Sequence, residues 1–360
     1  MLVWQWGQRG AGPRFAAEIA AALQAYDADV ALSLSRNAEA YRELSTLCRK
    51  NLPFEGRAQG GSGLRVLLGL PGQLRKLRRA LRADRPGTAI CAMMGYWDIP
   101  FALLLRAMGI KVLSVVHEVK GHPGDSHSRL YLLQRLMVRL SCEVVTLSDY
   151  VASEVKARWP GKTVVEAFHP PFAFSDLDLP SPSALMPQQG PLRLLVAGRL
   201  WAYKGVTLAL AALERLPEGS ASLRVVGSGA AVLPHAGSRQ AVTFEGRWLS
   251  ERDLVGEIDA AQVVLFPYIE ASQSGLVPLC LSRGRPAIVT DVGGLPDQLR
   301  DEVEGLVVRP QAGDIATAIG RLLGDPALLA DLSARAMRDN DPKERWRAFA
   351  KRLMPALVAR

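Results

Sequence analysis

The chain has 360 residues, of which 49% are hydrophobic and 22% are charged. This balance excludes a disordered chain and provides enough apolar material for two domain cores. The net charge of +9 lies wholly in residues 1–170, which carry 23 basic and 14 acidic side chains, and such a basic half favours an anionic partner.

Apolar runs alternate with helix-like segments through the first half of the chain. Leu2–Trp4 predicts a short strand, and a loop containing Gly10 and Gly12 leads from it into a helix over Phe15–Tyr26. Three further strands are predicted over Thr88–Met94, Val112–Val116 and Glu143–Leu147. Continuous apolar strands between helices are typical of a parallel sheet that is buried on both faces.

The densest basic stretch of this half is Arg75–Arg82. Leu74, Leu77 and Leu81 recur there at helical spacing with basic residues between them, which predicts an amphipathic helix. Such a helix is either a solvated face of the domain or a surface that lies on an anionic membrane, and the sequence leaves both alternatives open.

The cysteines and histidines do not have metal-ligand spacing. No two of the four cysteines form a CxxC pair, so we expect reduced thiols. His117, His122 and His127 recur every five residues, which matches neither a helix face nor a strand face, and no metal site is expected.

The N-terminus lacks a signal-peptide pattern, and no apolar run has the length of a membrane span. We therefore expect a cytoplasmic protein, with peripheral attachment to the inner face of the cytoplasmic membrane as an open alternative.

A Pro- and Ser-rich stretch, Phe172–Gly190, separates the two halves, and the strand pattern then restarts. The strands expected after it are Leu192–Ala197, Ser222–Val226, Val242–Phe244, Gln262–Phe266, Pro286–Thr290 and Gly305–Val308. Two successive βα series predict an α/β fold of two doubly wound, Rossmann-like domains that face a cleft. The expected division is a first domain over 1–171, a linker over 172–190, a second domain over 191–341, and a C-terminal helix over 342–360 that packs back on the first domain.

Candidate chemistry lies in the loops after strands, because ligands of such sheets bind at the carboxyl ends of the strands. The strand Leu192–Ala197 ends at Gly198 and Arg199, and Lys204 follows near the start of a helix. Arginine offers a planar fork of donors and lysine a movable point charge, a pair that suits a phosphate group. The simpler alternative is two solvated basic side chains.

A second loop, Phe266–Pro278, contains the small polar turn Ser272–Gly275, with the sequence Ser-Gln-Ser-Gly. Small residues let backbone N–H groups approach a diphosphate closely, although a plain helix cap would also explain the serines. A third loop, Thr290–Asp297, has a double-glycine turn after a strand.

In their order and spacing these three loops resemble glycosyltransferase family 4. The resemblance is carried by Gly198–Gly205, Pro267–Gly275 and Gly284–Pro296, which cover most of the second half, and more thinly by Val115–His117, Thr146–Ser148 and His169–Pro171. The family consists of retaining enzymes with the GT-B fold. The resemblance therefore implies that the first domain binds an acceptor and that the second binds a nucleotide sugar.

The resemblance also implies roles for individual residues. Arg199 and Lys204 fall on the family's phosphate-binding pair and His117 falls on its active-site histidine, so these three are the catalytic candidates. The implied donor-binding residues are Gly10, Gly12, Gly198, Arg247, Trp248, Glu270, Ser272, Gln273, Ser274, Gly275 and Leu276. The loop after His117 is expected to meet the acceptor through Lys120 and His122.

The sequence departs from the family at one point. The family commonly carries two glutamates eight residues apart around this turn, and their positions hold Ala271 and Leu279. Glu270 is adjacent but out of register by one. The second glutamate normally binds the ribose of the donor, which puts that contact in doubt here. The chain resembles a variant of the family with the Ser-Gln-Ser-Gly turn.

These features predict a retaining glycosyltransferase that moves a hexose from a UDP- or GDP-sugar to a sugar or lipid-linked saccharide in cell-surface polysaccharide or glycolipid synthesis. No cofactor or metal is expected, because Arg199, Lys204 and the turn amides would stabilise the charge of the leaving diphosphate. Two alternatives remain: a non-catalytic binding partner, and a nicotinamide-dependent oxidoreductase suggested by the glycine pair in Val226–Ala231. A nucleic-acid partner is not expected, because no nucleic-acid-binding motif is present.

Overall fold

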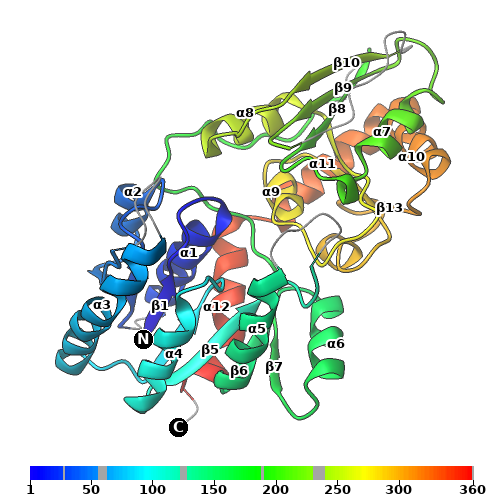
Figure 1. Ribbon diagram of the computed structural model, residues 1–360. Helices are drawn as coiled ribbons and strands as arrows, with labels where there is room; N and C mark the ends of the chain where they lie inside the picture. Colours follow the sequence, from blue (N-terminus) through cyan, green and yellow to red (C-terminus); the bar gives the residue numbers. More distant parts are fainter. Residues whose placement is uncertain (27–28, 56–62, 122–127, 188–189, 230–239, 359–360) are drawn as a thin grey trace. The chain divides into compact units, whose positions relative to one another are not determined.

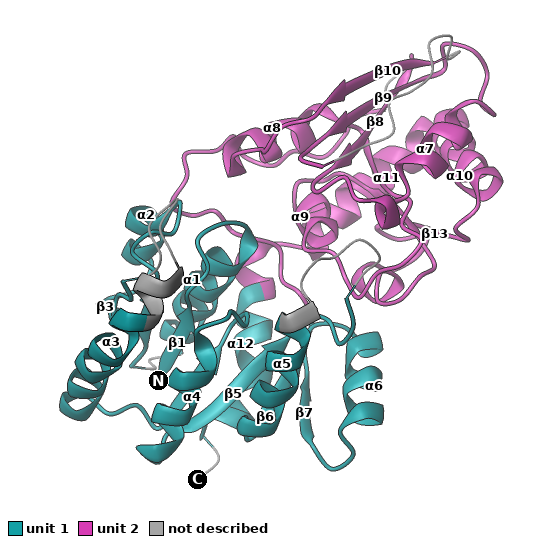
Figure 2. Ribbon diagram, in the orientation of Figure 1, with its two compact units in different colours: residues 1–121, 127–168, 346–360 teal, residues 122–126, 169–345 magenta. Residues whose placement is uncertain are grey.

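The computed structural model describes residues 1–26, 29–55, 63–121, 128–187, 190–229 and 240–358 (Figure 1). Two compact units divide the chain (Figure 2). Unit 1 comprises the described residues of 1–121, 127–168 and 346–360, and unit 2 comprises those of 169–345. The change of unit thus falls between Phe168 and His169, ahead of the Pro- and Ser-rich stretch, and the end of the chain returns to unit 1.

Unit 1 is built on a parallel sheet whose order in the described residues is β3-β2-β1-β4-β5-β6-β7. Its strands are β1 (Leu2–Gln5), β2 (Ala31–Leu34), β3 (Lys50–Asn51), β4 (Thr88–Cys91), β5 (Lys111–Val116), β6 (Glu143–Thr146) and β7 (Thr163–Glu166). The chain runs outward from β1 on one side and from β4 on the other. The sheet therefore has a topological switch point between β1 and β4, where Trp4 pairs with Cys91.

Seven helices of the described chain belong wholly or mainly to unit 1. They are α1 (Ala11–Gln24), α2 (Tyr41–Thr46), α3 (Gly63–Ala83), α4 (Asp98–Ala107), α5 (Ser128–Leu140), α6 (Asp149–Arg158) and α12 (Pro342–Val358). The Phe15 ring of α1 meets the Phe349 ring of α12 with centroids 6.1 Å apart, and both side chains are fully buried. The last helix therefore completes the core of unit 1. Among the described residues no helix has both the length and the apolar character needed to cross a membrane.

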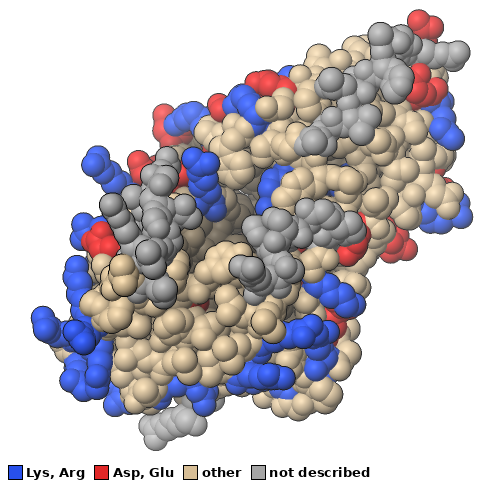
Figure 3. Space-filling model, viewed as in Figure 1, with Lys and Arg blue, Asp and Glu red and all other residues tan. Residues whose placement is uncertain are grey.

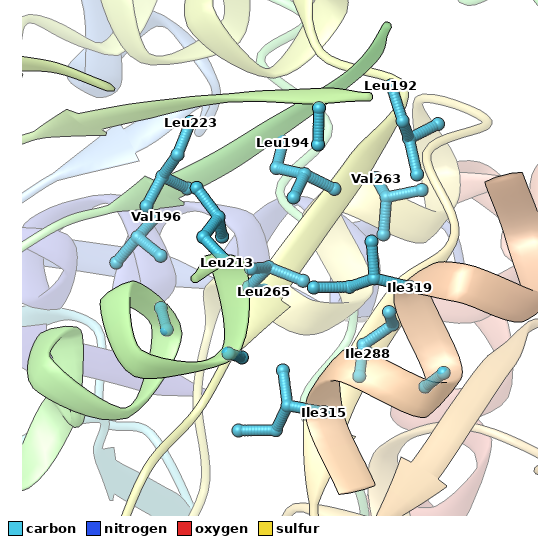
Figure 4. Close-up of a cluster of buried hydrophobic side chains, with 14 of the residues drawn as sticks. Leu192, Leu194, Val196, Leu213, Leu223, Val263, Leu265, Ile288, Ile315 and Ile319 are labelled. Atoms are coloured by element: carbon cyan, nitrogen blue, oxygen red, sulfur yellow. The ribbon is translucent and has the colours of Figure 1, made fainter. Parts of the chain in front are cut away.

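Unit 2 contains a second parallel sheet, of order β10-β9-β8-β11-β12-β13. Its strands are β8 (Leu192–Ala197), β9 (Ala221–Val226), β10 (Ala241–Glu245), β11 (Val263–Phe266), β12 (Ala287–Thr290) and β13 (Gly305–Val308). Its helices are η1 (Ala202–Lys204), α7 (Val206–Leu213), α8 (Glu251–Ala260), α9 (Leu276–Ser282), η2 (Pro296–Gln298), α10 (Ala312–Gly324) and α11 (Pro326–Asp339). The core lies between the sheet and the helices; Leu194, Leu265 and Ile319 meet there (Figure 4). The switch point of this sheet is between β8 and β11. Two doubly wound parallel sheets confirm the predicted fold class.

The Pro- and Ser-rich stretch is fastened to unit 2 by buried arginines. Arg283 donates to the Pro180 carbonyl at 2.8 Å, and Arg285 donates to the Ser183 carbonyl at 2.7 Å. Burial lowers the pKa of Arg285, but its guanidinium stays paired with backbone carbonyls in this well-packed region. The described part of this stretch is therefore held on the surface of unit 2 by hydrogen bonds.

Candidate functional site

Two loops meet at the switch point of unit 2, one after β8 and one after β11. Gly205, which follows η1, has a φ of 66°. A Cβ atom there would lie 1.7 Å from the carbonyl oxygen of Pro267, so only glycine fits. The Ile269 N–H also donates to the Tyr203 carbonyl at 2.9 Å. The loop that carries Lys204 is thus fixed directly against the loop that leads to the Ser-Gln-Ser-Gly turn.

Lys204 lies beside a buried tyrosine at this point. Its Nζ donates to the Tyr268 hydroxyl at 2.6 Å and stands 3.9 Å from the centre of the Tyr268 ring. Burial raises the pKa of Tyr268, so the phenol stays neutral and its oxygen can accept from the ammonium group. The same hydroxyl is 3.3 Å from Ser274 Oγ. The structure therefore links Lys204 to the turn through Tyr268, which the sequence pattern did not single out.

Arg199 is exposed directly after β8. Its guanidinium lies over the Trp201 ring, 4.7 Å from the ring centre, a distance that permits a cation–π contact. Among the described residues no carboxylate pairs with it. A stacked guanidinium keeps its in-plane N–H donors available to an anion.

The Ser-Gln-Ser-Gly turn is held by Gln298 of η2. Gln298 Oε1 accepts from the Ser274 N–H at 2.7 Å, and Gln298 Nε2 donates to the Ser274 carbonyl at 2.8 Å. The Leu276 N–H points at Ser274 Oγ over 3.4 Å. The diphosphate contact predicted for the Ser274 N–H therefore requires Gln298 to move. The contacts predicted for the N–H groups of Gly275 and Leu276 do not require this movement. Gln298 is a residue that the sequence analysis missed.

The remaining residues of the turn have different surroundings. Ser272 is buried and Gln273 is half-buried. The Gly275 Cα faces the imidazole of His169, and a Cβ at Gly275 would come within 3.2 Å of His169 Nε2. His169 Nδ1 is 2.7 Å from the Pro170 carbonyl and must carry a proton to make this bond. The imidazole therefore forms one wall of the turn.

The loop after β12 is locked to the same place. Gly293 has a φ of 54°, and a Cβ there would lie 1.5 Å from the Ala271 carbonyl oxygen. Thr290 Oγ1 donates to the Tyr268 carbonyl at 2.6 Å. Three consecutive loops at the carboxyl edge of the sheet are thus in direct backbone contact.

The positions of the two family glutamates lie in the core. Ala271 is 3% exposed and Leu279 is 1% exposed, so neither side chain reaches solvent. Glu270 is half-buried next to them and is the nearest carboxylate in the sequence. Neither Ala271 nor Leu279 can offer the carboxylate that binds the donor ribose in the family that the sequence resembles.

Arg247 and Trp248 follow β10, at the outer edge of the same sheet. Arg247 forms ion pairs with Glu245 and Asp253, and its Nη1 lies 2.8 Å from the Asp253 carboxylate. Trp248 is 49% exposed. Because β9 separates β10 from β8, these residues lie about 10 Å along the sheet from Gly198. Their predicted contact with the nucleobase stays a prediction.

The glycine pair before Ala230 has a local structural reason. Gly227 has a φ of 150°, and a Cβ there would lie 1.6 Å from the Gly198 carbonyl oxygen. Gly229 packs against the backbone of Leu200. These glycines let the loop after β9 approach the loop after β8. This close approach explains why glycines stand here, and no bound dinucleotide is needed to explain them. Ala230 and Ala231 lie outside the described residues.

In unit 1, His117 follows β5 and lies close to the switch point. Its Nε2 is 2.8 Å from the Ala92 carbonyl. A carbonyl only accepts, so Nε2 carries the proton and Nδ1 keeps the lone pair. Burial lowers the pKa of His117, against smaller contributions from Ala92 and Glu118. The ring is therefore neutral at pH 7.

The glycine-rich loop of unit 1 lies after β1. Gly10 has a φ of 81°, which favours glycine. A Cβ at Gly12 would lie 2.8 Å from Gln5 Nε2, so this position leaves no room for a side chain unless Gln5 moves. Lys120, predicted to meet the acceptor, is paired with Glu154 of α6 at 2.6 Å. His122 lies outside the described residues.

A buried carboxyl group supports the loop under His117. Asp98, at the start of α4, is fully buried and accepts from the Gly95 N–H at 2.6 Å. Burial raises the pKa of Asp98 to about 7. The Trp4 indole faces the same carboxyl group without meeting hydrogen-bond geometry. Asp98 thus holds the turn that begins at Ala92, and the Ala92 carbonyl accepts the hydrogen bond from His117. No sequence motif pointed to Asp98.

Comparison with known proteins supports a glycosyltransferase. Residues 191–325 match the family described as Glycosyl transferases group 1. The chain is 26% identical to alpha-D-kanosaminyltransferase of Streptomyces kanamyceticus, over 77% of this chain and 76% of that protein. It is 27% identical to a glycogen synthase of Mycobacterium tuberculosis, over 66% of this chain but only 60% of that protein.

Solved structures show the fold. The Anabaena protein Alr3699/HepE, in complex with UDP and glucose, superposes with a TM-score of 0.71 at 15% identity and covers 99% of both chains. This likeness identifies the two-unit architecture as that of GT-B glycosyltransferases.

Proposed function

We propose that this chain is a retaining, nucleotide-sugar-dependent hexosyltransferase of glycosyltransferase family 4. The observation that carries the proposal is the group Lys204–Tyr268–Ser274 at the switch point of unit 2. There a cation and a turn of small residues converge where parallel sheets bind ligands. The match of residues 191–325 covers this group.

The proposed chemistry rests on charge at the leaving diphosphate. As the sugar–phosphate bond breaks, negative charge grows on the diphosphate, and groups that bind this charge more strongly in the transition state accelerate the step. Lys204 would move from the neutral Tyr268 hydroxyl to a phosphate oxygen, and Arg199 would add its fork of donors. Because two cations supply this charge, we propose that transfer does not require a divalent metal or another cofactor.

His117 is proposed to orient the donor sugar. A neutral imidazole that is protonated on Nε2 offers Nδ1 as an acceptor, which suits a sugar hydroxyl better than a phosphate oxygen. The Ala92 carbonyl fixes the ring. We propose attack on the same face as the leaving group, with a donor phosphate oxygen taking the proton of the acceptor hydroxyl.

The donor is proposed to be a UDP-hexose, with GDP-hexose as the alternative. The Anabaena structure that shares this fold holds UDP and glucose, which favours UDP. The acceptor is proposed to be a saccharide or lipid-linked saccharide, bound near Lys120 and His122, in cell-surface polysaccharide or glycolipid synthesis on the cytoplasmic side. The basic half of the chain supports an anionic acceptor.

Calorimetric titration tests the donor site. The native chain is titrated with UDP, GDP, ADP and NADP, and the same titrations follow for Arg199→Ala and Lys204→Met. A charge-assisted hydrogen bond contributes about 1.5–3 kcal/mol, so each variant should bind the preferred nucleoside diphosphate roughly 10- to 150-fold more weakly. Arg215→Ala is the matched control, because Arg215 is an exposed arginine of unit 2 whose guanidinium, among the described residues, bonds only the Ala211 carbonyl, at 2.9 Å.

Each outcome of the titration has a clear meaning. Binding of one diphosphate, weakened to that extent in both site variants and unchanged in the control, supports the donor site. Binding of NADP alone would favour an oxidoreductase. Binding of none of the four would favour a non-catalytic partner with a glycosyltransferase fold.

A further inference from the structure

The outer surface of α3, α4 and α5 in unit 1 carries no described acidic side chain. α3 packs against α4 and α4 against α5, so the three helices form one layer. Arg106 of α4 ties this layer together by donating to the Leu140 carbonyl at the end of α5, at 2.6 Å. The three helices contain no glutamate, and their only aspartate, Asp98, is fully buried.

Basic side chains are exposed on all three helices. They are Arg75, Lys76, Arg78, Arg79 and Arg82 on α3, Arg106 on α4, and Arg135 and Arg139 on α5. None of them forms an ion pair with a described residue. Figure 3 shows basic side chains gathered over the part of unit 1 where Figure 1 places α3. The charge of this α3–α4–α5 face is therefore not compensated within the described chain.

Leucines stand exposed among these cations. Leu132 and Leu136 of α5 are 66% and 39% exposed, and Leu103 of α4 is 51% exposed. Leu132 and Leu136 lie one helical turn apart on the same side of α5. Arg135 and Arg139 share that side, because they follow Leu132 at i+3 and i+7. A stripe that alternates leucine with arginine suits an environment that is both apolar and anionic.

We propose that the α3–α4–α5 face docks on an anionic lipid bilayer, with its cations among the lipid phosphates and Leu103, Leu132 and Leu136 inserted between the acyl chains. Flexible cations spread over three helices need a negative surface but no complementary shape, which favours a fluid bilayer over a folded protein. The exposed leucines favour it over nucleic acid, which has no apolar interior to receive them. The inference does not depend on nucleotide binding by unit 2.

Vesicle flotation of the full chain tests the proposal. The chain is mixed with vesicles of phosphatidylcholine, or with vesicles in which about a third of the lipid is phosphatidylglycerol, at about 50 mM and about 500 mM NaCl. The native chain should float with the anionic vesicles at low salt and much less with the neutral ones. Each Lys or Arg near such a surface raises partitioning roughly fivefold, so Arg135→Glu/Arg139→Glu should weaken binding at least about 25-fold.

Two further double variants make the test specific. Arg252→Glu/Lys343→Glu changes the net charge equally at exposed sites on α8 and α12 and should bind as the native chain does. Leu132→Ser/Leu136→Ser keeps the charge and should lose the part of the binding that survives high salt. Equal losses in the two charge-reversed variants would overturn the proposal, since net charge alone would then explain binding. Absence of flotation of the native chain at low salt would also overturn it.

Discussion

The buried carboxyl group of Asp98 should make the protein less stable as the pH rises from about 4 to about 7. Burial raises the pKa of Asp98 from 3.8 to about 7 in the folded chain. Between these two values the folded state binds more protons at Asp98 than the unfolded state does, so the contribution of Asp98 to stability is greatest below about pH 4 and is lost as the pH rises to about 7. The difference between these two pKa values corresponds to at most about 4 kcal/mol of unfolding free energy.

Asp98→Asn isolates this contribution. Asparagine is uncharged at every pH, has nearly the same size, and can still accept from the Gly95 N–H through its amide oxygen. Cys91 is the titratable side chain that faces Asp98 among the described residues, and burial and Asp98 both raise the pKa of its thiol, so it stays protonated throughout. The variant should therefore gain stability relative to the native chain as the pH rises, by up to about 4 kcal/mol between pH 4 and pH 8.

Urea unfolding at a series of pH values measures the effect. Tryptophan fluorescence is a suitable signal because the Trp4 indole faces this carboxyl group. The difference in unfolding free energy between the two proteins at about pH 4 is the internal reference. Stability profiles that run parallel from pH 4 to pH 8 would refute the reasoning, since they would show that Asp98 ionises alike in the folded and unfolded chains.

Four other outcomes are expected. Gly205→Ala should lower the melting temperature by several degrees and abolish diphosphate binding, because its Cβ would meet the Pro267 carbonyl. The control Gly256→Ala in α8 has open space around it and should be neutral or slightly stabilising in the same melting scan. Gln298→Ala frees the Ser274 N–H but also releases the turn, and we expect the second effect to dominate, so that the calorimetric Kd for the diphosphate rises by about tenfold; an unchanged or lower Kd would show that the bond from Gln298 competes with the diphosphate. His117→Ala should lower kcat at least about 100-fold with little change in the Kd for the diphosphate, and near-native turnover would remove it from the mechanism. Transfer should survive an excess of a metal chelator, and activity restored only by added divalent cation would contradict the proposed role of the two cations.

The strands of unit 2 and the positions of the candidate loops were predictable because they depend on local signals. Apolar runs between helices located β8, β11 and β12 to within a few residues, and the loops after them contain the candidate residues Arg199, Lys204 and Ser274. The helix expected from Phe15 begins earlier, at Ala11, because Gly10 with positive φ ends the preceding loop there. The short strand Lys50–Asn51 has only two residues, both exposed, and offers no apolar pattern to read.

The partners of the site residues were not predictable, because they come from distant parts of the chain. Gln298 reaches Ser274 across 24 residues. His169 approaches Gly275 from the stretch that precedes β8. Asp98 gives no sign in the sequence that its carboxyl group will be buried at the base of the His117 loop. Such contacts depend on how strands are ordered in a sheet, which periodicity does not specify.

The glycines at the carboxyl edge of the unit 2 sheet hold the loops of the proposed donor site together. Gly227 touches the Gly198 carbonyl, Gly205 touches the Pro267 carbonyl and Gly293 touches the Ala271 carbonyl, so the loops after four neighbouring strands are joined by backbone alone. These contacts fix the positions of the loops before any ligand binds, which lowers the ordering cost of binding. The effects of loop geometry and of charge can therefore be tested separately. Glycine substitutions should weaken the binding of every ligand of this edge alike, whereas Arg199→Ala and Lys204→Met should weaken the binding of only those ligands that carry phosphate. If both classes of substitution weakened a nucleoside and its diphosphate equally, the cations would have no special role, and the assignment of the phosphate subsite would be wrong.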